Sequence, residues 1–122
     1  MKRTIVLASV AGLALGFVAI AVSVVSGAPH LAFRIVACVL LIDQAALTLL
    51  AARLPIAIRS VSIALRIGSV LAIAAGALLL VWSAFPHEGP PEIAMPAVGI
   101  AMIAHAALTL RYLGTVARSE TP

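Results

Sequence analysis

The chain has 122 residues, of which 64% are hydrophobic and only 10% charged, and eight Lys and Arg against four acids give a net charge of +4. A soluble domain of this size has no room to bury so much apolar surface, so the composition excludes a soluble globular fold. The basic residues are scattered and form no aromatic-rich patch, which argues against nucleic-acid binding. The composition predicts an integral membrane protein with the lipid bilayer as its surroundings.

Four apolar runs follow one another along the chain, at 4–25, 31–52, 67–85 and 93–113. Each has about the 20 residues that a helix needs to cross a bilayer. Because the bilayer core offers no water to backbone N–H and C=O groups, runs of this length must be helices rather than open strands. We therefore predict an all-α membrane protein, a single four-transmembrane-helix bundle over residues 1–122.

The first run follows Lys2 and Arg3 and ends in small residues, a pattern that secretory signal peptides share. The apolar part of a signal peptide is about 7 to 15 residues long, which is shorter than the run at 4–25. We expect this run to be a retained first helix.

The segment at 55–66, before the third run, has two interpretations. Arg59, Ser62 and Arg66 share one face of a helix there, while Ile63 lies on another face. This segment is either a short helix lying in the membrane interface or the early start of the third span, with Arg66 reaching to the headgroups.

The distribution of Lys and Arg predicts the orientation of the spans. Basic residues accumulate on the cytoplasmic side of membrane proteins. One side of this chain holds Lys2, Arg3, Arg53, Arg59, Arg66, Arg111 and Arg118, and the other side holds only Arg34. We expect both termini in the cytoplasm, and the inner membrane of a bacterium as the location.

An internal repeat is visible in the sequence. The string Ala-Ala-Leu-Thr-Leu at 45–49 recurs at 106–110, and Ser9 and Gly16 of the first run align with Ser69 and Gly76 of the third. The pattern predicts a duplicated two-helix hairpin. Since a hairpin of two spans returns to its starting side, the two copies should be related by an axis along the membrane normal.

Small residues recur every four positions in the first and third runs. The two ridges are Ala8, Gly12 and Gly16, and Gly68, Ala72 and Gly76. Such ridges let helix backbones approach closely, so we expect Gly12, Gly16, Gly68 and Gly76 to pack these two helices against each other or against a second subunit. In an alanine-rich chain, the alternative is that these residues only fill space.

A polar layer is predicted in the middle of the bundle. Asp43 lies near the centre of the second run, where a carboxylate costs about 2.5 to 3.5 kcal/mol on insertion scales. We expect Gln44, next to it, and Thr48, one turn on, to share its face. The aligned residues of the second copy are His105 and Thr109, and they fall at a similar depth. The expected layer is therefore Asp43, Gln44, Thr48, His105 and Thr109.

Two interpretations of this layer remain open. In the functional one, Asp43 is a protonatable site for proton or cation movement, with His105 and Gln44 as its partners. In the structural one, these groups bond to each other to set helix register, or pair with a basic residue of another protein. Ala104 aligns with Asp43, so the acid breaks the symmetry of the repeat.

The sequence offers only weak signs of a metal site or cofactor, and we expect neither. His30 and His87, with Glu88, have no defined ligand spacing, and Cys38, Met95 and Met102 are ordinary packing residues in apolar runs. No catalytic constellation is present in the sequence, so we do not expect an enzyme.

Our leading hypothesis is an accessory or structural membrane subunit that acts through helix–helix contacts. The alternative is an oligomeric proton- or cation-coupled transporter or channel for small solutes that uses Asp43. The expected partners are further copies of the chain or another membrane protein.

Overall fold

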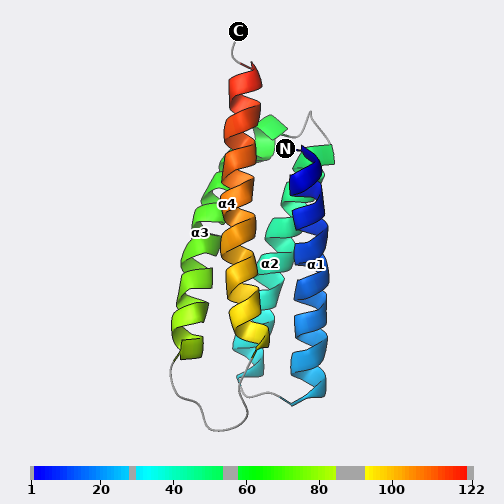
Figure 1. Ribbon diagram of the computed structural model, residues 1–122, viewed down its shortest axis with the longest axis vertical. Helices are drawn as coiled ribbons and strands as arrows, with labels where there is room; N and C mark the ends of the chain where they lie inside the picture. The colour runs from blue at the N-terminus through cyan, green and yellow to red at the C-terminus, as the bar shows by residue number, and fades with distance from the viewer. Residues whose placement is uncertain (1, 28–29, 54–57, 85–92, 121–122) are drawn as a thin grey trace.

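The computed structural model describes residues 2–27, 30–53, 58–84 and 93–120, and these residues form four helices. The helices are α1 (Lys2–Val25), α2 (Leu31–Arg53), α3 (Ile58–Ala84) and α4 (Ala94–Glu120). They run up and down side by side in one elongated bundle (Figure 1). Each contains a segment long and apolar enough to span a membrane. The predicted all-α bundle of four span-length helices is therefore confirmed.

The turn between α1 and α2 follows from local chain chemistry. Gly27 has a φ of 63°, a left-handed conformation that glycine adopts without steric cost. The Ser26 N–H donates to the Val22 carbonyl at 2.9 Å and the Gly27 N–H to the Val24 carbonyl at 3.3 Å, which satisfies carbonyls at the helix end. This turn sets α2 alongside α1 in the opposite direction.

The third and fourth helices extend beyond the apolar runs that predicted them. The α3 helix begins at Ile58 and continues without a break to Ala84, so the part of the 55–66 segment that the structure describes belongs to α3. The first residues of that segment, at 55–57, lie outside the described residues. The α4 helix continues past the predicted end at 113 to Glu120. Backbone hydrogen bonding does not stop where the apolar run does.

The helix contacts differ from the expectation that the first and third helices pack against each other. Each of α1 and α3 contacts both α2 and α4, and α2 contacts α4 through the middle of the bundle. Within the described residues, α1 and α3 do not contact each other, so their small-residue ridges are not packed together. The ridges face the other two helices because α2 and α4 lie between α1 and α3.

The buried residues of α1 form a seam with alternating steps of four and three: Ile5, Ser9, Gly12, Gly16, Ala19 and Ser23. The buried residues of α3 follow the same steps: Leu65, Ser69, Ala72, Gly76 and Leu79. This spacing averages 3.5 residues and is typical of helices that pack with a left-handed crossing.

The glycines on these seams admit the backbone of a neighbouring helix. A Cβ placed on Gly16 would lie 2.5 Å from Cγ1 of Ile42 in α2, and one on Gly76 would lie 2.7 Å from the carbonyl oxygen of Gly99 in α4. Gly12 and Gly68 also face α2. The small residues therefore hold the helices together within the bundle, mainly α1 on α2 and α3 on α4.

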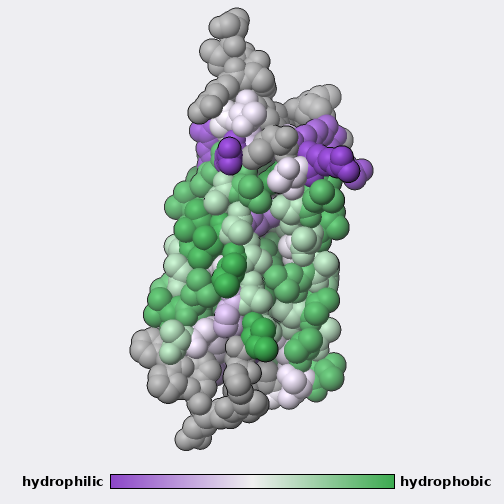
Figure 2. Space-filling model, in the orientation of Figure 1, coloured by the Kyte–Doolittle hydropathy of each residue, from purple (hydrophilic) through white to green (hydrophobic). Residues whose placement is uncertain are grey.

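The outside of the bundle is apolar along its middle. Figure 2 shows a broad hydrophobic band, with hydrophilic residues gathered at the end where both termini lie. Large exposed side chains occur on every helix, among them Leu7, Phe17, Val36, Leu78 and Ile100. An apolar surface of this extent suits lipid and is rare on a soluble monomer.

Candidate functional site

Two threonines meet where α2 and α4 cross at the centre of the bundle. The Oγ1 atoms of Thr48 and Thr109 are 3.3 Å apart, and both side chains are buried. Each hydroxyl also lies 2.9 Å from a carbonyl oxygen one turn earlier in its own helix, that of Gln44 or His105. Because each hydroxyl has one proton, the two threonines can make only two of these three hydrogen bonds at a time: each donates to its own carbonyl, or one of them donates across the helix pair instead.

Two further hydrogen bonds flank the threonine pair, and each joins a helix of one hairpin to a helix of the other. Ser9 Oγ of α1 lies 3.0 Å from Nε2 of His105 in α4. Gln44 Nε2 of α2 donates to Ser69 Oγ of α3 at 2.8 Å and to the carbonyl of Leu65 at 3.4 Å. All four polar side chains are buried, so these bonds form in a low-dielectric interior where an unpaired polar group is costly.

These three contacts are arranged with approximate two-fold symmetry. A shift of 60 residues carries Ser9 to Ser69, and a shift of 61 carries Gln44 to His105 and Thr48 to Thr109. The Ser9–His105 bond is thus the counterpart of the Ser69–Gln44 bond, and the threonine pair is its own counterpart. The Gln44 amide and the His105 imidazole thus occupy aligned positions, and each hydrogen-bonds to a serine at an aligned position.

The structure places Asp43 outside this layer. Gln44, Thr48, His105 and Thr109 are buried and lie together, whereas the Asp43 side chain is exposed. No hydrogen bond or ion pair joins it to the part of the chain that the structure describes. Successive residues of a helix are about 100° apart, so neighbours such as Asp43 and Gln44 do not share a face. The expectation that they would is corrected here.

Asp43 lies on an otherwise apolar outer face of α2. The exposed residues around it on this face are Val36, Val39, Leu40 and Leu50. Val36 and Leu50, each seven residues from Asp43, are 58% and 47% exposed, so the carboxylate is the polar centre of an apolar stripe. Asp43 is twelve residues from the first residue of α2, roughly 18 Å along the axis and so near the middle of this helix. This surface is called the Asp43 face below.

Sequence reasoning did not include Ser9 and Ser69 in the polar layer, although the repeat alignment had already paired them. The available signal was their spacing: Ser9 precedes Gly16, and Ser69 precedes Gly76, by seven residues, which is two helical turns along a buried seam. A serine on such a seam must find a partner inside the bundle.

A second contact missed from the sequence lies at the opposite end of the bundle from the termini. Arg34 is only 3% exposed, and its guanidinium carbon lies 5.6 Å from the centre of the Trp82 ring. Phe33 and His30 pack on the same ring, with centroids 5.2 and 6.0 Å away. A cation over an indole face is attracted by the ring quadrupole, which helps a charge to lie at the edge of the apolar band.

The described residues give little support for a metal site or for redox chemistry. Within the described residues, no group of three or more His, Cys, Asp and Glu is placed to hold a metal ion. His87 and Glu88 lie outside these residues. Cys38 is buried as a free thiol, and Met95 and Met102 belong to the apolar core. His105 bonds through Nε2 to Ser9, and its Nδ1 has no hydrogen-bond partner.

No family model matches this chain, and no similar curated protein or solved structure is found. Its function has to be inferred from its own residues.

Proposed function

We propose that this chain is a four-span membrane protein that acts as an accessory subunit and binds another membrane protein through the Asp43 face. The observation that carries the proposal is the position of Asp43, exposed at the middle of α2 between Val39, Leu40 and Leu50. A carboxylate facing lipid at this depth costs about 2.5 to 3.5 kcal/mol on insertion scales. A neighbouring helix that supplies a hydrogen-bond donor removes much of this cost.

The chemistry of the partner follows from what the chain itself offers. Exposed residues at the depth of Asp43 on the other helices are apolar, for example Ala11, Val70 and Ala104. A second copy would therefore present to Asp43 either apolar side chains or another carboxylate. The donor is better supplied by a different chain, and we assign the partner a transmembrane helix with Lys or Arg near its centre.

Crosslinking tests this proposal directly. A photoreactive residue at Val39 should crosslink a foreign protein in native membranes, and one at Val70 on α3 should not. Asp43→Leu should abolish the Val39 crosslink, while Ala104→Leu, at the equivalent place on α4, should leave it unchanged. Equal crosslinking from Val39 and Val70, or a Val39 crosslink that persists in Asp43→Leu, would refute the Asp43 face as the docking surface.

A second candidate function is an oligomeric proton- or cation-coupled transporter or channel. It is supported by the same outward carboxylate, because several copies with Asp43 turned inward would line a shared polar pathway. The interior of a single bundle is a poor candidate for this pathway, because its polar side chains already have partners. Gln44 and His105 hydrogen-bond to serines, and the two threonines lie within hydrogen-bond distance of each other. In liposomes, Asp43→Asn should then abolish flux. Unchanged flux would exclude Asp43 as the carrier.

We further propose that both termini are cytoplasmic and that the protein resides in the inner membrane of a bacterium. Lys2, Arg3, Arg53, Arg66 and Arg111 lie at one end of the bundle, and the positive-inside rule assigns this end to the cytoplasm. Reporter fusions to each terminus test the orientation. Activity of a periplasmic reporter at either end would contradict it.

Duplication of a two-helix hairpin is proposed as the origin of the fold. Its support is the symmetric arrangement of Ser9–His105 and Ser69–Gln44 about the threonine pair. The proposal predicts that the two hairpins, 1–53 and 58–122, reassemble when co-expressed as separate chains. Failure to recover a stable pair would count against two equivalent building blocks.

A further inference from the structure

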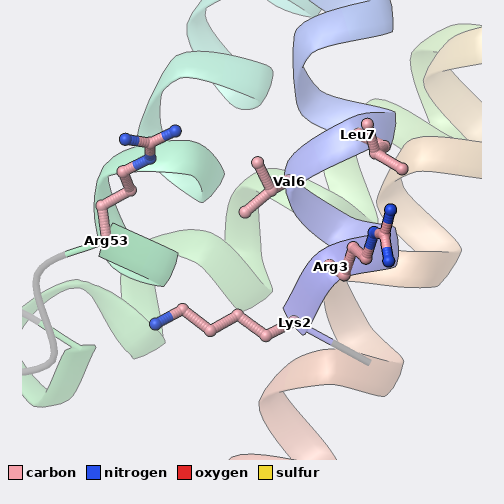
Figure 3. A pocket seen from close by; sticks show the side chains of 5 residues that line it. All are labelled: Lys2, Arg3, Val6, Leu7 and Arg53. Atoms are coloured by element: carbon pink, nitrogen blue, oxygen red, sulfur yellow. The ribbon is translucent and has the colours of Figure 1, made fainter.

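The basic end of the bundle contains a pocket that is separate from the polar layer and from the Asp43 face. It lies where α1 begins and α2 ends, has a volume of about 600 Å³, and is lined by Lys2, Arg3, Val6, Leu7 and Arg53 (Figure 3). This volume falls within the range of about 300 to 1,000 Å³ found for sites that bind small molecules.

Three of the five lining residues are cations, and none is an acid. Lys2 extends from α1 toward the side of the gap where Arg53 stands at the end of α2, and Val6 projects from α1 into the same gap, whereas Arg3 lies on the other side of α1 (Figure 3). All three cations are exposed. An anion in the gap would be attracted by both Lys2 and Arg53, which line it from α1 and α2.

The backbone adds to this attraction for an anion. The α1 helix begins at Lys2, so its first N–H groups have no partner within the helix and carry the positive end of the helix dipole. Side-chain cations and free N–H groups at one helix start form a suitable environment for a phosphate. Phosphate oxygens accept hydrogen bonds from both kinds of donor.

The remaining walls of the pocket are apolar, which narrows the class of ligand. Val6 projects from α1 into the gap, and Leu7 lies on the other side of α1 near Arg3 (Figure 3). Leu7 and Val10 are 61% and 50% exposed and continue this surface toward the middle of the bundle. A free phosphate would use only the cations, whereas a phospholipid would also lay an acyl chain along these apolar residues.

We propose that this pocket binds the phosphate headgroup of an anionic phospholipid, with Lys2 and Arg53 as the main contacts and Val6 and Leu7 against the start of an acyl chain. The site is independent of the partner proposed for the Asp43 face. Bound lipid bridges the ends of α1 and α2 and so stabilises the first hairpin.

Native mass spectrometry of the full chain in detergent tests the site, with phosphatidylglycerol as probe and phosphatidylcholine as its neutral counterpart. Each cation near an anionic headgroup is worth about a fivefold change in affinity, so K2Q/R53Q should weaken phosphatidylglycerol binding about twentyfold or more. The control is R66Q/R111Q, which removes two exposed cations of α3 and α4 at the same end. Because neither Arg66 nor Arg111 lines the pocket, this control should weaken binding clearly less than K2Q/R53Q does.

Two outcomes would overturn the proposal. An equal loss in both double variants would mean that only diffuse surface charge attracts the lipid. Full displacement of phosphatidylglycerol by millimolar inorganic phosphate, together with no effect of Leu7→Ser, would identify a site for free phosphate instead. Asp43→Leu is expected to bind phosphatidylglycerol like the unaltered chain, which separates this test from that of the proposed function.

Discussion

Gly76 offers the sharpest test of how α3 and α4 pack. A Cβ at this position would lie 2.7 Å from the carbonyl oxygen of Gly99 and 2.8 Å from Cγ1 of Ile103. The Ile103 side chain can rotate, but the Gly99 oxygen belongs to a helix backbone and moves only if α4 moves. Overpacking of this kind costs about 1 to 3 kcal/mol, and the higher helix propensity of alanine returns up to about 1 kcal/mol. With a gain of about 1 kcal/mol subtracted from this cost, we expect Gly76→Ala to lower the free energy of unfolding by up to about 2 kcal/mol.

Gly114→Ala is the matched control, because nothing lies within 4 Å of a Cβ at Gly114 and the same propensity gain applies. It should leave stability unchanged or raise it by up to about 1 kcal/mol. Gly12→Ala, where the nearest atom is Cβ of Ala45 at 3.4 Å, should fall between the two. Unfolding by SDS in mixed micelles, followed by circular dichroism, measures all three. Equal stability of Gly76→Ala and Gly114→Ala would refute the close approach of α3 and α4 at this point.

Three further predictions concern the polar contacts. A double-mutant cycle of Ser9→Ala and His105→Phe should give a coupling of about 0.6 kcal/mol in the free energy of unfolding, the usual value for a hydrogen bond between membrane helices. Zero coupling would show that the 3.0 Å contact contributes nothing to stability. Replacing Thr48 and Thr109 together by valine should cost less than the sum of the single replacements, because each single variant leaves one hydroxyl without its neighbour. Trp82→Leu should lower stability by about 0.5 to 2 kcal/mol through loss of the ring beside the buried arginine, while Trp82→Phe should cost less; a larger loss in Trp82→Phe would contradict the ring contact.

The number, class and approximate bounds of the helices could be predicted from the sequence because each depends on local composition. The length of an apolar run fixes whether it is long enough to span, and the α1 and α2 helices end within a residue of the predicted limits of 25 and 52. The bounds of α3 and α4 differ more. Arg66 limits the apolar run ahead of the third span, and Gly114, Thr115 and Arg118 follow the end of the fourth. The helices continue past these residues because backbone hydrogen bonds form whether or not the side chains are apolar.

The buried face of each helix was harder to predict. In a soluble protein the apolar face turns inward, but lipid is as apolar as a leucine side chain, so burial in a membrane bundle does not follow hydrophobicity. Small and weakly polar residues mark the inside instead, as Ser9, Gly12 and Gly16 do on α1. Asp43 was assigned to the interior because it is polar. Around the helix axis, however, it lies about 100° from the buried Gln44, and its side chain is exposed.

If the Asp43 face binds a partner as proposed, the alignment of Ala104 with Asp43 bears on how many partners one bundle can bind. Asp43 on α2 and Ala104 on α4 are both exposed, but only Asp43 is charged. Two identical flanks would bind two partners and could link subunits into an open chain. With a carboxylate on one flank only, the proposed docking through Asp43 predicts one partner helix for each copy of the chain and an assembly that ends at this subunit.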